Sequence, residues 1–410
     1  MMRHWLFKLI TVIFLIFQIF SPIWYFIQIS GTLVLSIYVG LILLLFPTLY
    51  KSKSVIYLSI YTFITFILFI SGNAFFGTFN SVIIPYLTVV SSLLLVEYVK
   101  LYRENSIIIT IVYTTFILLF IISIISIPQV KINPNIIRGA SVSAVASENI
   151  STYYWVIGYG LIHGISIIFA PLCFLIKKEY FNNKLLAFIW LLVIILLLYI
   201  VYLSNASTAF IISIFSLLSG LFINYSDFSR KNFFKTLTFI TTLILLFNKT
   251  TIIVFLDSIQ PLFNEMGGNY AKIGDIKDYF IYGEADGGII ARESLYNLSI
   301  KEFLKSPIFG TNSPEKIGLH SYFLDRLAAL GLFFIIPLFL MFASHIKSIY
   351  KILNKTKVVY SISCFSYLLM LSLKNEFGTG AFLIYFAILP IFCIYIDEKL
   401  TYKQKNNNES

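Results

Sequence analysis

The sequence has few charged residues, and this scarcity excludes a water-soluble globular protein. Only 12% of its 410 residues are Asp, Glu, Lys or Arg, whereas 59% are hydrophobic, and the mean hydropathy is +0.88. Soluble domains have about a quarter of their residues charged. Several apolar runs exceed the roughly 18 residues that mark a membrane-spanning helix, and they lack the alternation of barrel strands. We therefore expect an all-α, polytopic membrane protein.

The sequence also lacks clusters of cysteine and histidine. Its three cysteines, Cys173, Cys364 and Cys393, all lie in apolar stretches, which excludes a disulfide framework and indicates small buried side chains. The four histidines are scattered along the chain, and none stands at a spacing typical of a metal site. We therefore expect neither a metal ion nor a cofactor.

The hydrophobic runs predict about twelve transmembrane helices. They lie near 9–28, 31–49, 55–72, 80–98, 106–127, 153–176, 185–203, 207–224, 236–256, 322–344, 358–373 and 378–396. If the N-terminus is cytoplasmic, 19 Lys and Arg fall in cytoplasmic connections, whereas the short external loops hold only Lys131, Arg138 and Lys374. The positive-inside rule then places both termini in the cytoplasm. The net charge of +11 is thus a signal of topology, which excludes nucleic acid as a partner.

One external connection, 257–321 between the ninth and tenth spans, is much longer than the others. Loops longer than about 15 residues within a compact fold are usually functional or disordered. Its first part, 264–288, is polar and rich in glycine, which predicts a mobile flap. Residues 289–307 have the periodicity of a short helix at the membrane interface. We expect a single transmembrane domain over 1–396, including this loop, followed by a disordered polar tail over 397–410.

Polar and charged residues gather at three places on the external face. The long loop ends in GLHSYFLDRLAALGL, where His320, Asp325 and Arg326 stand at the entrance to the tenth span. A second loop carries Arg138 after an Asn-Pro turn, and a polar break, LSNASTAF, separates the seventh and eighth spans. Because the topology puts all three on one side of the membrane, we expect them to approach one another.

Several short stretches on this face form an ordered set of polar and small residues. They are Pro134-x-x-x-Arg138, Ser204–Thr208, Arg292-Glu-Ser-Leu-Tyr296, Ser306-Pro-Ile-Phe-Gly310, His320-Ser-Tyr-Phe-Leu-Asp325 and Leu330-Gly331. This order resembles the O-antigen ligase and Wzy-type polymerase superfamily of bacterial envelope-glycan enzymes. The chain departs from that pattern at Gly-Thr-Asn after Phe309, where relatives often show Gly-x-Gly. It departs again at SNAST, where many relatives carry a basic residue.

The resemblance implies a substrate and a place in the cell. The donor and the acceptor would be oligosaccharide repeat units linked to polyprenyl diphosphate, on the outer face of the bacterial cytoplasmic membrane. The reaction would join one unit to a sugar hydroxyl of another and release the lipid diphosphate, for capsule, exopolysaccharide or O-antigen biosynthesis. A flippase and a chain-length regulator are further partners that the resemblance implies, besides the membrane lipid itself.

The chemistry of such a transfer suits three of the residues as catalytic groups. A diphosphate leaving group near a low-dielectric boundary needs cations, and the planar guanidinium groups of Arg138 and Arg292 match phosphate oxygens. His320 is the candidate general base for the acceptor hydroxyl, since a neutral imidazole accepts a proton near neutral pH. The chain has no Asp-x-Asp pair of the kind that holds a metal in many sugar-nucleotide transferases, so we expect a metal-independent reaction.

Three further residues are candidates for substrate binding. Asp325 is a candidate orienting group, although five residues separate it from His320, which makes a direct pair on one helix improbable. Tyr296 belongs to the Arg292 motif. Lys249 falls within the ninth predicted span, at a depth where an ionisable side chain suggests a functional site, such as one for the lipid diphosphate.

Each candidate also has a purely structural interpretation. Arg138 and Arg292 could be solvated loop residues, His320 a polar residue at a helix start, and Asp325 a charge that complements the helix dipole. Lys249 could extend its side chain toward the membrane surface, and the same is expected of Arg326. His163 is expected to be a packed, hydrogen-bonded residue, and no role is assigned to His4 or His345 at the cytoplasmic boundary.

Two other functions remain open at this point. A glycan ligase of the same superfamily would share the architecture and move finished glycan to a different acceptor. A transporter, for example a flippase for lipid-linked oligosaccharides, also suits twelve spans with cytoplasmic termini. Such carriers commonly have two related halves with charges near the midplane, whereas here a long loop interrupts only the second half and acidic residues are lacking at mid-membrane.

Overall fold

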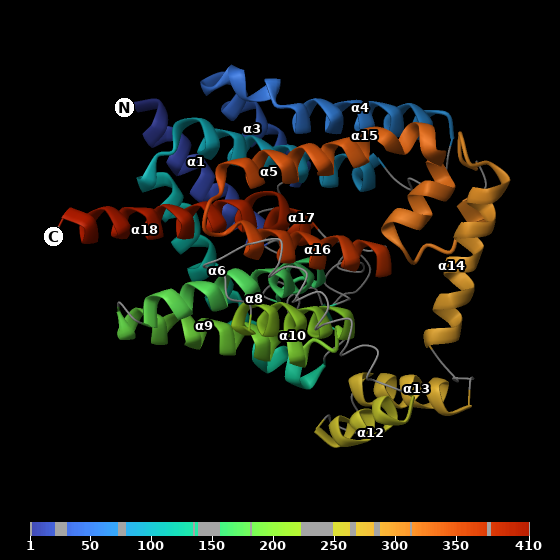
Figure 1. Cartoon of the computed structure of the whole chain (residues 1–410). Coiled ribbons are helices and arrows are strands. Elements are labelled where there is room, and N and C mark those ends of the chain that lie inside the picture. Colours follow the sequence, from blue (N-terminus) through green and yellow to red (C-terminus); the bar gives the residue numbers. More distant parts are fainter. Residues whose placement is uncertain are drawn as a thin grey trace.

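The structure, a computed structural model, describes residues 2–20, 31–72, 79–133, 136–137, 156–180, 183–222, 249–262, 268–282, 288–311, 314–374 and 379–409. Regular secondary structure in these ranges is helical (Figure 1). The helices are α1 (Met2–Ile19), α3 (Gly31–Leu45), α4 (Lys53–Ile70), α5 (Phe79–Tyr102), α6 (Asn105–Ile132), α8 (Tyr159–Tyr180), α9 (Lys184–Leu203), α10 (Ser207–Phe222), α12 (Lys249–Ile259), α13 (Gly268–Tyr282), α14 (Gly288–Lys305), α15 (Tyr322–Ile352), α16 (Lys357–Leu373), α17 (Thr379–Leu383) and α18 (Leu389–Glu409). A π-helical turn, Ile384–Ile388, joins α17 to α18.

The protein is a multi-pass membrane protein by the length and hydropathy of its helices. Eight helical segments of the described part are long and apolar enough to cross a membrane, and each coincides with a predicted span. Three shorter apolar helices, Gly31–Leu45, Ser207–Leu221 and Lys357–Leu373, coincide with three more. The first span begins earlier than predicted, because α1 is already helical at Met2.

The ninth predicted span, 236–256, lies mostly outside the described residues. The chain on its two sides is placed at opposite ends of the bundle. α10 ends where Lys177 of α8 donates to the carbonyl oxygen of Leu221 (2.8 Å), near the C-terminal helix. α12 packs on α13, and α13 packs on α14, at the other end.

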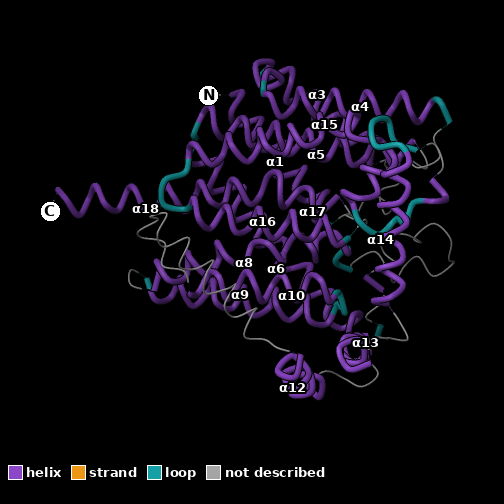
Figure 2. The backbone as a smooth tube through the Cα atoms, turned by 45° about the vertical axis from the view of Figure 1, so that its right-hand side comes forward, coloured by secondary structure: helices purple, strands orange, loops and turns teal. Residues whose placement is uncertain are grey.

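The helices run side by side, with both chain termini at one end of the bundle, here named the terminus end (Figure 1). At the opposite end, the α14 end, helix α14 runs across the axes of the other helices, an arrangement that persists when the molecule is turned by 45° (Figure 2). The sequence predicted a short helix for this segment, and α14 confirms it. Its crosswise direction suits a helix that lies at a membrane surface.

The core is formed by α8 and by the continuous α17–α18 segment. In each, 94% of the spanning residues are buried, compared with 28% in α4 and 39% in α9. The outer faces of α4 and α9 expose large apolar side chains such as Phe63, Leu185 and Ile195. Such extensive apolar surface is typical of helices that are solvated by lipid acyl chains.

Helix α15 is broken one third of the way along, at Gly331. This glycine has a φ of +66°, and the loop that follows α14 docks into the break through Gly310, with a φ of +77°. The amides of Leu332 and Phe333 donate to the carbonyls of Pro307 and Ile308 (2.8 and 3.0 Å). A Cβ at Gly331 would lie 2.4 Å from the amide nitrogen of Gly310. The loop therefore satisfies the backbone groups that the break exposes, as a low-dielectric environment demands.

Two segments are more regular than the sequence indicated. The glycine-rich part of the long loop, expected as a mobile flap, contains helix α13, which Lys277 ties to Asp257 of α12 (2.9 Å). The tail expected to be disordered from 397 continues α18 through Glu409. The first residue of this tail, Asp397, has a structural role, because its carboxylate accepts three backbone N–H groups of residues 354–356, at 3.0, 2.6 and 3.0 Å. Those amides lie directly before α16, so the carboxylate caps the start of that helix.

Candidate functional site

Helix α14 presents one face toward the start of α15 and the end of α16. Arg292, Tyr296 and Ser299 lie on this face, at spacings of four and three residues. The Tyr296 hydroxyl donates to the carbonyl oxygen of Leu373 at the end of α16 (3.0 Å). Burial raises the pKa of Tyr296, so its phenol stays protonated and remains a hydrogen-bond donor at neutral pH.

The chain between α14 and α15 turns tightly against α14, and this turn places His320. The amide of Gly318 donates to the Ser299 hydroxyl (3.0 Å). A Cβ on Gly318 would lie 1.9 Å from the carbonyl oxygen of Leu295, so only glycine permits this approach. Leu319 follows with a φ of +52°, which redirects the chain into His320.

Asp325 holds this turn together. Its carboxylate is 1% exposed and accepts from the Ser299 hydroxyl (2.6 Å) and from the amide of Ser321 (2.8 Å). Ser321 in turn caps α15 by accepting from the amide of Leu324 (3.3 Å). The sequence suggested substrate binding for Asp325, but both of its oxygens are engaged inside the protein. This geometry gives Asp325 a positioning role, since it links α14, the His320 turn and α15.

His320 lies half-buried above Tyr296, with the two ring centroids 5.6 Å apart. Its Nε2 is buried and has no hydrogen-bond partner in the described part of the chain. Burial, together with the positive charges of Lys374 and then Arg292, lowers the pKa of His320 from 6.5 to about 4. The imidazole is therefore neutral at physiological pH, with one nitrogen able to accept a proton.

Lys374 is the residue that the sequence did not identify as part of the site. In the sequence, Lys374 stands out only as one of the few basic residues of the short external loops. Its backbone carbonyl accepts the amide of Tyr322 at the start of α15 (2.9 Å), which brings the end of α16 beside the His320 turn. The sequence signal was present in the position of Lys374 directly after an external span end, but only the packing of α16 reveals its neighbours.

Arg292, His320 and Lys374 form the cationic cluster of the α14 end. Arg292 and Lys374 both act electrostatically on the His320 ring, and Arg292 also acts on Tyr296. Among the described residues Arg292 makes no ion pair. The carboxylate of Asp325 is directed into the turn between α14 and α15. The cluster is therefore suited to an anionic ligand.

Arg326 does not extend toward the membrane surface as expected. Its guanidinium carbon lies 3.5 Å from the centroid of the Tyr322 ring, and its Nε donates to the hydroxyl of Tyr61 in α4 (3.2 Å). The cation–π contact and the hydrogen bond hold the side chain between α15 and α4. Arg326 therefore joins two helices next to the site and is separate from the cationic cluster.

Two predicted site residues cannot be placed against the cluster. Arg138 lies outside the described residues. Lys249 is the first residue of α12, and its side chain also lies outside the described part. The predicted contacts of both with a diphosphate remain predictions. Of the six candidates, the structure brings together Arg292, Tyr296 and His320, and it adds Lys374.

The arrangement offers two chemical capabilities in one place. Arg292 and Lys374 place positive charge near His320, which would stabilise negative charge on a ligand, and the neutral imidazole can accept a proton. No protein-family model matches this chain, and no curated protein matches it.

Proposed function

We propose that this protein is a membrane glycosyltransferase that polymerises oligosaccharide repeat units linked to polyprenyl diphosphate. The observation that carries the proposal is the convergence of Arg292 and Lys374 on a neutral His320, at the end of the bundle opposite the termini. With the basic connections cytoplasmic, twelve spans and both termini inside, this end faces the exterior of a bacterial cytoplasmic membrane. The resemblance of the His320 and Arg292 motifs to envelope-glycan polymerases supports the same conclusion.

In the proposed reaction, the neutral imidazole of His320 removes the proton from a hydroxyl of the acceptor sugar. The hydroxyl oxygen forms a bond to the anomeric carbon of the donor, and the bond from that carbon to the diphosphate oxygen breaks. The lipid diphosphate leaves with the bonding electron pair, and Arg292 and Lys374 stabilise its charge. The Tyr296 ring lies beside the His320 ring and offers a face on which a sugar could pack, while its hydroxyl is bound to the Leu373 carbonyl.

Donor binding would change the strength of the base in this reaction. Burial, and after it the positive charges of Lys374 and Arg292, lower the pKa of His320 to about 4, which makes it a weak base in the unliganded protein. A bound diphosphate would offset the two cations and so relieve that part of the lowering. His320 would therefore be a stronger base with the donor in place than without it.

The alternatives receive less support from the described residues. A ligase would use the same cluster, and only the acceptor distinguishes it. A carrier would use an open helix break near the midplane, as many transporters do. The break at Gly331 is instead filled by the Pro307–Thr311 loop, whose backbone groups pair with those of α15.

The test is complementation of a strain that lacks this gene. Intact protein should restore long glycan chains, whereas His320→Ala and Arg292→Ala should leave mainly single repeat units, since loss of a general base slows transfer about 10²-fold or more. Lys301→Ala is the matched control, because Lys301 is exposed and on the same helix. It should restore long chains fully.

Other outcomes identify the alternatives. Full-length glycan with both site variants, at normal membrane levels, would refute the site. A null strain with normal polymer that fails to reach its final acceptor would identify a ligase. Repeat units trapped on the cytoplasmic leaflet in the null strain would identify a flippase.

A further inference from the structure

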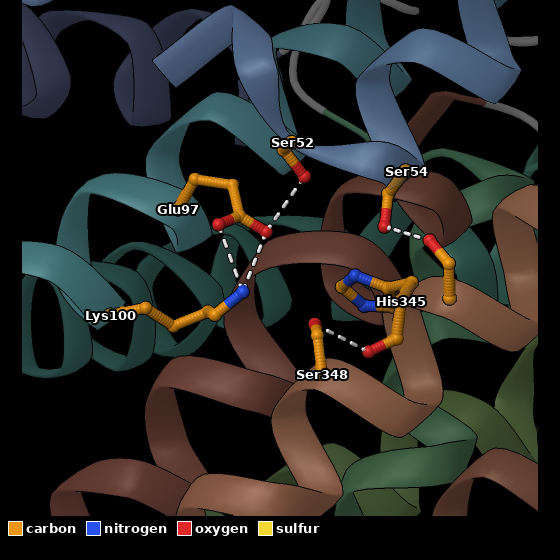
Figure 3. Close-up of polar contacts among 7 residues, drawn as sticks. Ser52, Ser54, Glu97, Lys100, His345 and Ser348 are labelled. Carbon is orange, nitrogen blue, oxygen red and sulfur yellow. Dashed lines mark hydrogen bonds and ion pairs between the residues drawn. The ribbon is translucent and has the colours of Figure 1, made fainter. Parts of the chain in front are cut away.

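A second polar cluster contains Ser52, Ser54, Glu97, Lys100 and His345 (Figure 3). The start of α4, the end of α5 and the last third of α15 build it. It lies at the terminus end, because Tyr98 of α5, two residues before Lys100, hydrogen-bonds to His4 of α1. No sequence pattern connects these three elements.

The cluster contains two internally paired groups. Lys100 donates to both oxygens of Glu97 (2.8 Å each), and the Ser52 hydroxyl donates to one of them (3.0 Å). The hydroxyls of Ser54 in α4 and Ser344 in α15 share one hydrogen bond (2.6 Å). Each of the two hydroxyls has one hydrogen, and their mutual bond uses only one of these. The other hydrogen can therefore be donated elsewhere.

His345 stands between these groups and lacks partners of its own. It is 1% exposed, and both ring nitrogens are buried without a hydrogen bond in the described part of the protein. The rings of Tyr385 and Phe386, from the π-helical turn, cover it on another side, with centroids 6.0 and 5.2 Å away. A neutral imidazole needs one donor and one acceptor, and leaving both unmatched inside a protein is unfavourable.

The surroundings decide what kind of ligand satisfies His345. Lys100 has one N–H beyond the two that bind Glu97, and its charge acts on the imidazole. Because Glu97 neutralises Lys100, the cluster has no surplus charge for a phosphate. Its single carboxylate is engaged, so a divalent cation would lack oxygen ligands. A small neutral molecule that both donates and accepts hydrogen bonds fits, and water is the smallest.

We propose that His345, Ser54, Ser344 and Lys100 form an internal hydration site that binds ordered water and is reached from the terminus end. The path enters along the Glu97–Lys100 pair, whose side chains are 11% and 15% exposed, in contrast to the buried imidazole. The π-helical turn is a local distortion of the kind often found at functional sites, and it brings Tyr385 onto His345. The proposal is independent of the proposed enzymatic function.

Cysteine accessibility tests this site. In a background with Cys173, Cys364 and Cys393 replaced by Ala, His345→Cys should react with a small charged methanethiosulfonate added at the terminus end, because only a hydrated thiol ionises. Met341→Cys is the control, since Met341 lies one turn away on α15, is 2% exposed and packs in the apolar core. We expect His345→Cys to react about tenfold or more faster than the control.

The unsubstituted protein provides a second measurement. Radiolytic hydroxyl-radical footprinting oxidises buried side chains that contact bound water, so the peptide with His345 should be labelled in the folded protein. A His345→Cys thiol as unreactive as that of Met341→Cys would refute the site. So would an unlabelled His345 in the footprinting of the native chain, which holds even if the variant misfolds.

Discussion

The two ends of the molecule treat charge in opposite ways. At the terminus end, three buried carboxylates of the described residues have partners within the protein. Glu97 pairs with Lys100, Glu179 pairs with Lys399 (2.8 Å), and Asp397 accepts three backbone amides. At the α14 end, the cationic cluster gathers Arg292 and Lys374 around His320, while its neighbouring carboxylate, Asp325, is turned into the protein.

This difference separates structural charges from charges available to a ligand. A carboxylate with its partners inside the protein strengthens packing and has little left to offer a ligand. Cations gathered together repel one another and depress the pKa of a nearby histidine, which is unfavourable unless an anion relieves it. The α14 end therefore stores an unfavourable electrostatic arrangement at a position where an anionic substrate would be bound.

The largest effect should come from reversing the charge of the cluster. Arg292→Glu replaces a stabilising cation with a repelling anion, so the rate of glycan polymerisation should fall about 10²–10³-fold or more. Lys301→Glu makes the same charge change on an exposed position of α14 and should leave the rate nearly unchanged. Chain length in the complemented null strain measures both. Equal effects of the two variants would mean that net charge alone matters.

At the terminus end, Asp397→Ala should affect stability and leave chemistry intact. It removes the acceptor of three amides at the start of α16, so we expect a loss of about 2–4 kcal/mol. Asp397→Asn retains one acceptor oxygen and should lose less. The apparent Tm of the protein in detergent measures this. An unchanged Tm for Asp397→Ala would show that water replaces the carboxylate.

Asp325→Ala tests whether the corresponding carboxylate at the α14 end is a positioning group. The Ser299 hydroxyl and the Ser321 amide would lose their acceptor, with a loss of about 1–3 kcal/mol. Limited proteolysis between α14 and α15 should become faster than in the parent protein. If Asp325 instead contacts substrate, proteolysis and Tm would stay the same while the affinity for donor falls.

The smallest expected effect is a shift of pH dependence in Lys374→Met. The lowered pKa of His320 means that its neutral form, and the stability linked to it, are complete above about pH 6.5 and are lost as pH falls toward 4. Removing Lys374 relieves one repulsion, so the pKa of His320 should rise toward 6.5. Modification of His320 by diethyl pyrocarbonate against pH, followed by peptide mass spectrometry, measures it. A midpoint that stays near 4 would show that burial and Arg292, without Lys374, account for the lowered pKa.

The positions of most helices could be predicted from the sequence, because a helix that is solvated by lipid needs a long, continuous apolar run. Long apolar runs such as 106–127 and 185–203 each became a spanning helix, and α14 followed from its helical spacing. The glycine-rich segment misled the prediction, since α13 forms despite Gly268 and Gly274. Helix α13 contacts α12 and α14, and this tertiary packing overrides a low intrinsic helix propensity.

The candidate site was predictable only in part. Arg292, Tyr296 and His320 carried recognisable motifs, whereas Lys374 stands alone after a short span and has no local pattern. Ser306-Pro-Ile-Phe-Gly310 and Leu330-Gly331 also stood out, but their role in filling the break of α15 requires two backbones to meet. His345 gave no sequence signal, because a histidine near a span end is ordinary until its neighbours are known.

By itself the sequence determined that the chain resides in a membrane, and it predicted the approximate places of the helices. These properties depend on the local balance of apolar and charged residues, which is written along the chain. Tertiary structure decided which charged groups are brought together and which are held inside the protein. Asp325 and Arg326 are neighbours in sequence, yet one braces a turn and the other joins two helices, while Lys374 arrives from α16. The reason is physical: electrostatic and hydrogen-bond energies depend on distances between side chains, and only the packed helices set those distances.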